Sequence, residues 1–269
     1  MRCGAGWLVF MVTVVVGCTV GVSSAEAPPD AARLARPMPE PAYESPDVEI
    51  AGYSPEEPMF KRYPEAALFE LPRPAAPATP LFETLRTRRS RRRYAAGGLT
   101  LEELSHLLWA ASGVTARRWG IPLRTAPSGG ALYPIEVYVV VHDVEGLEPG
   151  IYHLAVEPFV LERLREGDWR AECAWSSMNQ TGRNHEGCVI VMTQVVRRIT
   201  QRYGERGERY GWQEMGAMMQ NVLLAVESLG LSTVPIGAFH DDRVGRILGI
   251  DHQREVPGLM LPVGRRVAQ

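Results

Sequence analysis

Two groups of arginines, far apart in the chain, have the residue types of a phosphate site. The first group is Arg88, Arg89, Ser90 and Arg92, and the second is Gly264, Arg265 and Arg266. A guanidinium group presents a planar fork of donors that can hold two oxygens of one anion, and a serine hydroxyl adds a neutral donor. Several such groups around one point can neutralise a dianion.

Two glycine-containing turns can bring backbone amides close to a flat ligand. They are Pro127, Ser128 and Gly129, and Pro235, Ile236, Gly237 and Ala238. Because glycine has no Cβ atom, the backbone at such a turn can approach a ligand closely. Taken alone, a run of arginines is more typical of a solvated face. The turns and the arginines together favour a site for a flat molecule that carries a phosphate.

These motifs resemble those of a known family. The spacing Arg-Arg-Ser-x-Arg-x-Tyr from Arg88 is similar to the opening motif of the nitroreductase family of FMN enzymes. The stretch from Arg124 to Tyr138 resembles the branch of that family that oxidises azolines to thiazoles and oxazoles in modified peptides. Gln220-Asn221, Val234–Phe239 and the closing Pro-Val-Gly-Arg repeat the pattern of that branch. The matches run from about Leu81 to Arg266.

The resemblance implies a fold and a role for each motif. The fold is α+β and nitroreductase-like, with a mixed central sheet flanked by helices and FMN at a homodimer interface. Arg88, Arg89, Ser90 and Arg92 would hold the phosphate and ribityl chain, and Arg265 or Arg266 would reach the same phosphate. Pro127, Ser128 and Gly129 would line the flavin from the other subunit. The backbone amide of Gly237 or Ala238 would point at flavin N5, where an amide stabilises the reduced ring.

The segment 201–210 carries a departure from the family pattern. It is charged and interrupted by glycines, which suits either a lid over the site or the exposed start of a helix. Azoline-oxidising relatives look as if they have a lysine followed by a tyrosine here, whereas this chain has Arg202 and Tyr203. Because arginine does not deprotonate in proteins, Arg202 cannot act as a general base. The departure argues against azole formation and leaves Tyr203 as a candidate acid.

We therefore expect an exported FMN-dependent oxidoreductase that passes hydride through flavin N5 in two steps, from a donor and then to an acceptor. The substrate is a small molecule or a peptide. Three alternatives stay open: an azoline-to-azole dehydrogenase, an NAD(P)H-dependent nitroreductase, and a flavin-binding module without turnover. A nucleic-acid binder built on the arginine run is disfavoured, because no aromatic residue interrupts the run and the net charge is −2.

The amino terminus has the three-part pattern of an export signal over residues 1–25. Arg2 precedes an apolar core, and the small residues up to Ala25 provide a cleavage site. Cleavage before Cys18 is an alternative, because Val15-Val16-Gly17-Cys18 resembles the bacterial lipoprotein box, and lipidation would tether the protein to a membrane. The expected location is the periplasm or a membrane surface. An uncleaved span is the third possibility.

The rest of the chain divides into residues 26–80, expected to be a linker, and residues 81–269, expected to be one FMN-binding domain. The linker holds 13 of the 21 prolines, which disfavour helices and central strands. Hydrophobic spacing predicts helices over 81–89, 101–112, 213–229 and 242–248, and strands over 135–141, 188–193 and 259–263. No metal site is expected, and the spacing of Cys173 and Cys188 permits a disulfide without requiring one.

Overall fold

The computed structural model describes residues 57–74, 79–182 and 185–268. The expected export signal, Cys18 and most of the expected linker lie outside the described residues. Within the described part of the chain, no helix is long and apolar enough to cross a membrane. The same residues contain no group of three or more His, Cys, Asp or Glu that is arranged to hold a metal ion.

Six helices and nine strands make up the described residues. The helices are α2 (Leu81–Thr87), α3 (Leu101–Ser112), α4 (Arg170–Ser176), α5 (Val196–Tyr203), α6 (Arg206–Ser228) and α7 (Asp241–Leu248), with a short 3-10 turn η1 at Gly129–Ala131. The strands are β1 (Ala67–Glu70), β2 (Val114–Arg118), β3 (Ile121–Arg124), β4 (Ile135–Val141), β5 (Gly150–Ala155), β6 (Val160–Glu166), β7 (Glu186–Val195), β8 (Leu231–Thr233) and β9 (Glu255–Arg265).

Seven strands form one sheet in the order β1-β6-β5-β4-β7-β9-β8, and β2 pairs with β3 in a separate hairpin. Every pair of neighbouring strands in the large sheet is antiparallel. The α+β class and the sheet flanked by helices are confirmed, but the strand directions correct the expectation of a mixed sheet. For β4, β5 and β6 this follows from the connections, because these strands are joined by short segments that cannot make a parallel crossover.

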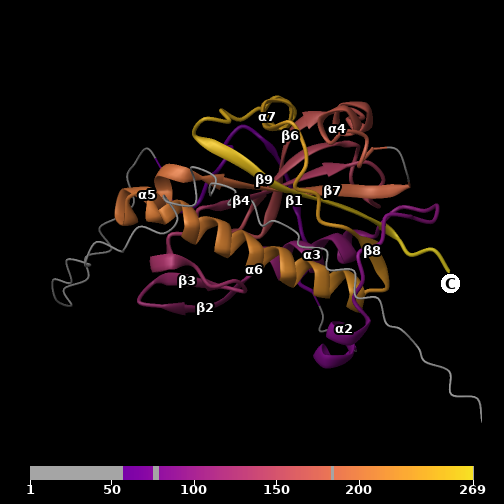
Figure 1. The fold of residues 1–269 in the computed structure, drawn as a ribbon, viewed down its shortest axis with the longest axis horizontal. Coiled ribbons are helices and arrows are strands. Elements are labelled where there is room, and N and C mark those ends of the chain that lie inside the picture. The colour runs from indigo at the N-terminus through magenta and orange to yellow at the C-terminus, as the bar shows by residue number, and fades with distance from the viewer. Residues whose placement is uncertain (1–56, 75–78, 183–184, 269) are drawn as a thin grey trace, which may run out of the picture. The chain divides into compact units, whose positions relative to one another are not determined.

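Helices cover both faces of the sheet (Figure 1). The central strand β4 is buried along its whole length. Since successive side chains point to opposite faces, Val137 and Val139 pack in the core with α3 and α6, whereas Tyr138 and Val140 pack in a second core with α4 and α7. A strand covered on both faces explains why the sequence here is an unbroken apolar run.

Several predicted helix ends are confirmed. Thr100 and Glu103 form the predicted capping box, and Gly113 follows α3 as predicted. Gly249 ends α7 with φ 72°. The long helix α6 starts at Arg206, earlier than its hydrophobic spacing indicated, so the segment 201–210 is the end of α5 and the start of α6. The helix-start interpretation of that segment therefore describes it better than a lid.

Part of the expected linker belongs to the fold. We call residues 57–70 the N-terminal strap. Its last residues form β1, which pairs with β6 at the edge of the sheet. Before β1, Lys61 pairs with Glu255, and the Nε atom of Arg62 lies 2.9 Å from Glu162 Oε1. Residues 57–70, expected to be linker, therefore belong to the described fold.

Beneath the strap lies a row of buried charges. His153, fully buried on β5, contacts Glu136 Oε2 at 3.0 Å through Nε2 and Glu162 Oε2 at 2.8 Å through Nδ1. Glu136 also pairs with Arg198 at 2.7 Å. Isolated charges are costly to bury, so each member of the row depends on its neighbours.

Candidate functional site

The last turn of α6 gathers the arginines from both ends of the folded chain. Glu227 is buried there, and its Oε2 atom lies 2.5 Å from Arg91 Nη1 and 2.9 Å from Arg266 Nη2. Arg266 also donates two hydrogen bonds to the carbonyl oxygen of Leu231. Burial would raise the pKa of Glu227, but Arg91 and Arg266 lower it below its usual value. One carboxylate thus fixes two guanidinium groups that are far apart in sequence.

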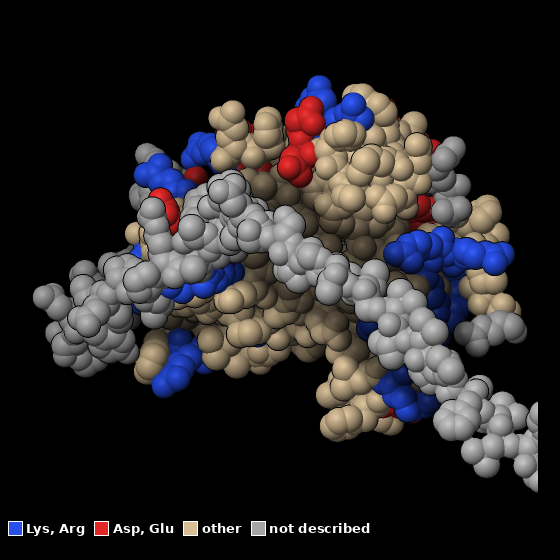
Figure 2. Space-filling model, in the orientation of Figure 1, with Lys and Arg blue, Asp and Glu red and all other residues tan. Residues whose placement is uncertain are grey.

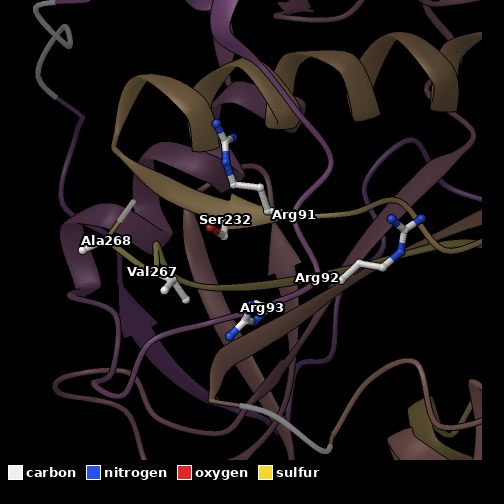
Figure 3. A pocket seen from close by; sticks show the side chains of 6 residues that line it. All are labelled: Arg91, Arg92, Arg93, Ser232, Val267 and Ala268. Atoms are coloured by element: carbon white, nitrogen blue, oxygen red, sulfur yellow. The ribbon is translucent and has the colours of Figure 1, made fainter.

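These cations border two adjoining hollows. One is lined by Arg89, Arg91, Glu227 and Arg266, together with residues of α2. The other is lined by Arg91, Arg92, Arg93, Ser232, Val267 and Ala268. Figure 3 shows Ser232 between Arg91 and Arg93, with Arg92 extending away from Val267 and Ala268. The Oγ atom of Ser232 is buried and has no hydrogen-bond partner among the described residues.

We call Arg91, Arg92, Arg93 and Arg266 the arginine cluster. Of the neighbouring residues Arg265 and Arg266, only Arg266 belongs to it. Arg265 extends toward α3, where its Nη1 atom is 2.5 Å from Glu103 Oε1 and its Nε–H donates to the carbonyl oxygen of Gly98. Arg266, the next residue, faces Glu227. Gly264 is a packing residue, because a Cβ atom there would lie 2.9 Å from both the carbonyl oxygen of His185 and the ring of Tyr94. Of the two arginines predicted at the phosphate, Arg266 lies with the other arginines and Arg265 does not.

The turn at 235–238 follows β8 near the arginine cluster. The backbone N–H of Arg91 donates to the carbonyl oxygen of Thr233 at 2.8 Å, which ties the arginine run to the start of this turn. Pro235 is half-buried, and Ile236 is buried and pairs with Met260. Gly237 and Ala238 are exposed, and a Cβ atom at Gly237 would meet nothing within 4 Å. Open space next to this backbone leaves room for a ligand.

The second predicted turn lies against Arg202 and Tyr203. Gly130 has φ 63°, and a Cβ atom on it would lie 2.6 Å from Tyr203 Oη and 3.2 Å from Arg202 Nη1. The ring of Tyr203 meets that of Tyr210 edge to face, with 5.3 Å between centroids. Pro127 is exposed, while Ser128 and Gly129 are half-buried. The fold thus brings together two motifs that are about 75 residues apart in sequence.

The backbone after this turn is strained. Ala131 has φ 53° and Tyr133 has φ 48°, values that residues with a side chain rarely adopt. Arg198 Nη1 donates to the carbonyl oxygen of Tyr133 at 2.7 Å, and the backbone N–H of Tyr133 donates to Ser128 Oγ at 2.8 Å. Such strain persists only where surrounding contacts hold it, and it is common at functional sites.

Within one chain, the predicted site residues form two separate groups. The arginine cluster is fixed to Glu227 near the end of α6, whereas the Ser128 turn lies against Tyr210 near its start. At 1.5 Å per residue, these two points on the helix are about 25 Å apart. The two groups therefore lie near opposite ends of α6.

Sequence reasoning missed three residues near these groups. Arg91 and Ser232 line the hollow beside the arginines, but neither was distinguished from its neighbours. Glu214 is 4% exposed on α6, and burial raises its pKa to about 7 against the opposing effects of Ser128 and Arg124. The sequence did offer a signal for Glu214, since it stands beside the methionines of the predicted core face of the long helix. A carboxylate is rarely buried without a partner, so a glutamate at such a position indicates a special role.

Comparisons with known proteins agree on one family. The model of the nitroreductase family matches residues 85–265. The Methanocaldococcus jannaschii protein MJ1384, which is named as a nitroreductase, is 42% identical over 187 residues, or 70% of this chain and 91% of the relative. The microcin B17-processing protein McbC of Escherichia coli is 26% identical over 141 residues, or 50% of this chain and 51% of McbC.

A solved structure agrees with the sequence comparisons. The crystal structure described as a nitroreductase from Anabaena variabilis superposes with a TM-score of 0.67 and 28% identity, and the match covers 77% of this chain and 44% of that chain. The present chain therefore spans about half the length of McbC and less than half of the Anabaena protein.

Proposed function

Because the chain belongs to the nitroreductase family, we propose that it is an FMN-dependent oxidoreductase whose substrate is a small molecule or a peptide. The predicted family and fold class are confirmed by the family match. The observation that carries the proposal is the arginine cluster around the unpartnered hydroxyl of Ser232. Membership of a family supports the cofactor, while the reaction must be argued from the site.

The residues present fit the phosphate of FMN. Arg88, Arg92 and Arg93 form no ion pair with another described residue, so their charges are available to an anion. Arg91 and Arg266 are held in place by Glu227, and Ser232 offers a buried donor. Ser90 is exposed in the same run. Phosphate oxygens match this set of donors, because guanidinium groups bind them in pairs.

When bound, FMN would supply hydride acceptance at N5 and then hydride donation to an acceptor, which is the two-step transfer that we propose. The protein binds the cofactor through the arginine cluster and offers the open backbone of Gly237 and Ala238 to a ligand. Beside the Ser128 turn, Tyr203 can donate or accept a hydrogen bond through its hydroxyl, and Arg202 supplies a fixed positive charge.

We propose that the working form is a homodimer in which each site takes the arginine cluster from one subunit and the Ser128 turn from the other. The separation of the two groups along α6 supports this arrangement. The side chains of Leu81, Phe82 and Leu85 on α2 support it as well, because they are 58%, 83% and 45% exposed in the single chain. Apolar surface of this kind is typical of an interface.

A second candidate is the oxidation of azolines to azoles in a modified peptide. The match to McbC, whose name says that it processes microcin B17, favours it. Arg202 in place of a lysine disfavours it, because that position then lacks a group that can accept a proton. An NAD(P)H-dependent nitroreductase would differ from these candidates in its electron donor, whereas a flavin-binding module would bind FMN and show no fast reoxidation by any acceptor.

We also propose that the protein is exported and is either free in the periplasm or tethered through Cys18. The signal-like pattern of residues 1–25 supports this proposal. A nucleic-acid partner is not part of it. On the face shown in Figure 2, lysine and arginine side chains gather in several separate groups, whereas a nucleic-acid binder presents one continuous basic surface. Cell fractionation with mass spectrometry of the mature amino terminus tests the export.

The first experiment is the visible spectrum of the full chain after incubation with FMN and removal of unbound cofactor. We expect retained flavin bands and release of FMN on denaturation. Replacing Arg92 with alanine is expected to raise the dissociation constant for FMN by about tenfold or more, since a hydrogen bond to a charged group contributes about 1.5–3 kcal/mol. Arg246→Ala is the matched control, because Arg246 is an exposed arginine paired with Asp242 on α7. A folded protein that retains no flavin would contradict the proposal.

A further inference from the structure

A carboxyl group is buried directly behind the Ser128 turn. Glu214 lies on the stripe of α6 that faces the sheet, next to Met215 and Met218. One turn earlier, Gly211 packs so closely on the end of β7 that a Cβ atom would lie 2.3 Å from Gln194 Nε2. This close approach of helix and sheet removes Glu214 from solvent.

The hydroxyl of Ser128 connects this carboxyl to the site. Its oxygen already accepts the backbone N–H of Tyr133 at 2.8 Å, so its own proton is directed elsewhere. A hydrogen bond from Ser128 lowers the pKa of Glu214, and because an ionised carboxylate can only accept, the Ser128 hydroxyl is the donor. The second carboxyl oxygen, Oε2, is buried and has no partner among the described residues. That oxygen is available to carry a proton.

Charged groups from two other elements face Glu214. Arg124 on β3 and Arg198 on α5 lie close enough to affect its titration. Both arginines also face Glu136 on β4, which pairs with Arg198 at 2.7 Å and with His153 at 3.0 Å. Glu136 is therefore committed to its own partners, and Glu214 forms no ion pair with a described residue.

The balance of these effects leaves Glu214 able to change charge near neutral pH. Burial raises its pKa to about 7, although the hydrogen bond from Ser128 and the charges of Arg124 and Arg198 lower it. Glu136 behaves differently, because burial is outweighed there by Arg198 and His153, which lower its pKa to about 2. A carboxyl with a pKa near ambient pH can both accept and return a proton.

We propose that Glu214 stores the proton of the reaction and exchanges it with the substrate through the hydroxyl of Ser128. This inference rests on the proposed function, and it makes Glu214 a positioning residue behind Ser128. Arg202 cannot take up a proton, whereas Glu214 is a group near the Ser128 turn that can. His153 does not serve this purpose, because both of its ring nitrogens are engaged by glutamates.

Oxidation of a donor moves one proton from the substrate to Glu214. The X–H bond next to the reacting carbon breaks, its proton passes to Ser128 Oγ, and the hydroxyl proton of Ser128 passes to Glu214. The electron pair of X–H becomes the new C=X bond. The C–H bond of the reacting carbon breaks at the same time, and its hydrogen leaves with the bonding electron pair as a hydride, which oxidised FMN, the oxidant of the proposed function, would accept. In the return step, the neutral acid of Glu214 gives its proton, again through Ser128, to an acceptor such as a quinone that receives the hydride.

The first test is an infrared titration of the full chain, labelled with ¹³C in its glutamate carboxyl groups, compared with Glu214→Gln. We expect one protonated-carboxyl band that disappears as the pH rises, with a midpoint near pH 7. The band should be absent from Glu214→Gln. It should be unchanged in the control Glu172→Gln, because Glu172 is exposed on α4. Ser128→Ala should retain the band and move its midpoint upward, because the hydrogen bond lowers the pKa. A Glu214 band that disappears below pH 5 would overturn the inference. The titration needs no FMN, so it tests the charge change of Glu214 even in protein that retains no cofactor. Failure of the inference and failure of the proposed function can therefore be told apart.

The second test is the rate at which menadione reoxidises the reduced FMN-loaded protein between pH 5 and 9. We expect a rate for the parent protein that falls above pH 7, as Glu214 loses its proton. Glu214→Gln and Ser128→Ala should both be slower by about 100-fold at pH 6, without that inflection, since a positioned proton donor contributes about 10²–10⁴-fold. Equal rates and equal pH profiles in the parent protein and in both variants would overturn the inference. Ser128→Ala keeps the test valid if Glu214→Gln does not fold.

Discussion

Replacing Glu136 with glutamine tests whether the buried row of charges stabilises the fold. Glu136 is 5% exposed, and its two oxygens contact Arg198 at 2.7 Å and His153 at 3.0 Å. Glutamine keeps the shape of the side chain and removes its charge. Arg198, which is 2% exposed and holds the carbonyl oxygen of Tyr133, then lacks its anion.

The size of the effect follows from the pKa of Glu136. Burial raises this pKa, but Arg198 and then His153 lower it from 4.5 to about 2. A shift of about 2.5 units corresponds to about 3 kcal/mol of stability at pH 7, at 1.36 kcal/mol per unit. The folded-state pKa is the lower one, so this stability is present above pH 4.5 and is lost as the pH falls toward 2.

Urea unfolding curves at pH 7 and at pH 3 measure the difference between parent and variant. We expect the free energy of unfolding of Glu136→Gln to be lower by about 3 kcal/mol at pH 7, with a smaller gap at pH 3. Glu172→Gln makes the same chemical change on the exposed surface of α4 and should differ little from the parent. A gap below about 1 kcal/mol at pH 7, or a gap of the same size at both pH values, would refute the reasoning.

Three further predictions concern the site and the thiols. Arg266→Ala should weaken FMN binding by about tenfold or more in isothermal titration, because it removes a guanidinium group from the cluster, and an unchanged affinity would exclude Arg266 from the phosphate site. Gly130→Ala should lower the free energy of unfolding by about 1–2 kcal/mol, since alanine is strained at φ 63° and its Cβ would press on Tyr203; an unchanged denaturation midpoint would argue against this conformation. Cys173 and Cys188 are free and buried, and burial raises the pKa of each thiol to about 12. Mass-spectrometric labelling at pH 8 should therefore leave both unmodified until the protein is denatured, and rapid labelling of the native protein would contradict their burial.

Local sequence signals predicted the elements whose causes are themselves local. The capping box at Thr100 and Glu103 and the stop at Gly249 depend on residues within one turn of the chain, and both are confirmed. The apolar run of β4 predicted its bounds, because burial on both faces requires apolar side chains throughout. The strap was missed, since its strand pairs with β6 about 90 residues away and nothing in the prolines around it reports that pairing.

In the candidate site too, local sequence signals predicted the segments but not the contacts between distant segments. The residue types of the arginine run and of the turns predicted candidate ligand-binding segments, but not which of their residues lie close together. Arg265 and Arg266 are neighbours at the end of a strand and face opposite directions, so only the orientation of the sheet distinguishes them. The burial of Glu214 depends on the contact between Gly211 and Gln194, which belong to different elements. A property created by such a contact has no signature in either segment alone.

The pairing of β1 with β6 bears on solubility. The family match covers residues 85–265, whereas β1 lies before that range and pairs along the outer side of β6. A chain shortened to the matched region, or cut by a protease between β1 and α2, would leave the N–H and C=O groups of β6 without partners along an open edge. Such an edge pairs readily with the same edge of another molecule, so loss of the strap should convert a dispersed protein into one that self-associates through its sheets.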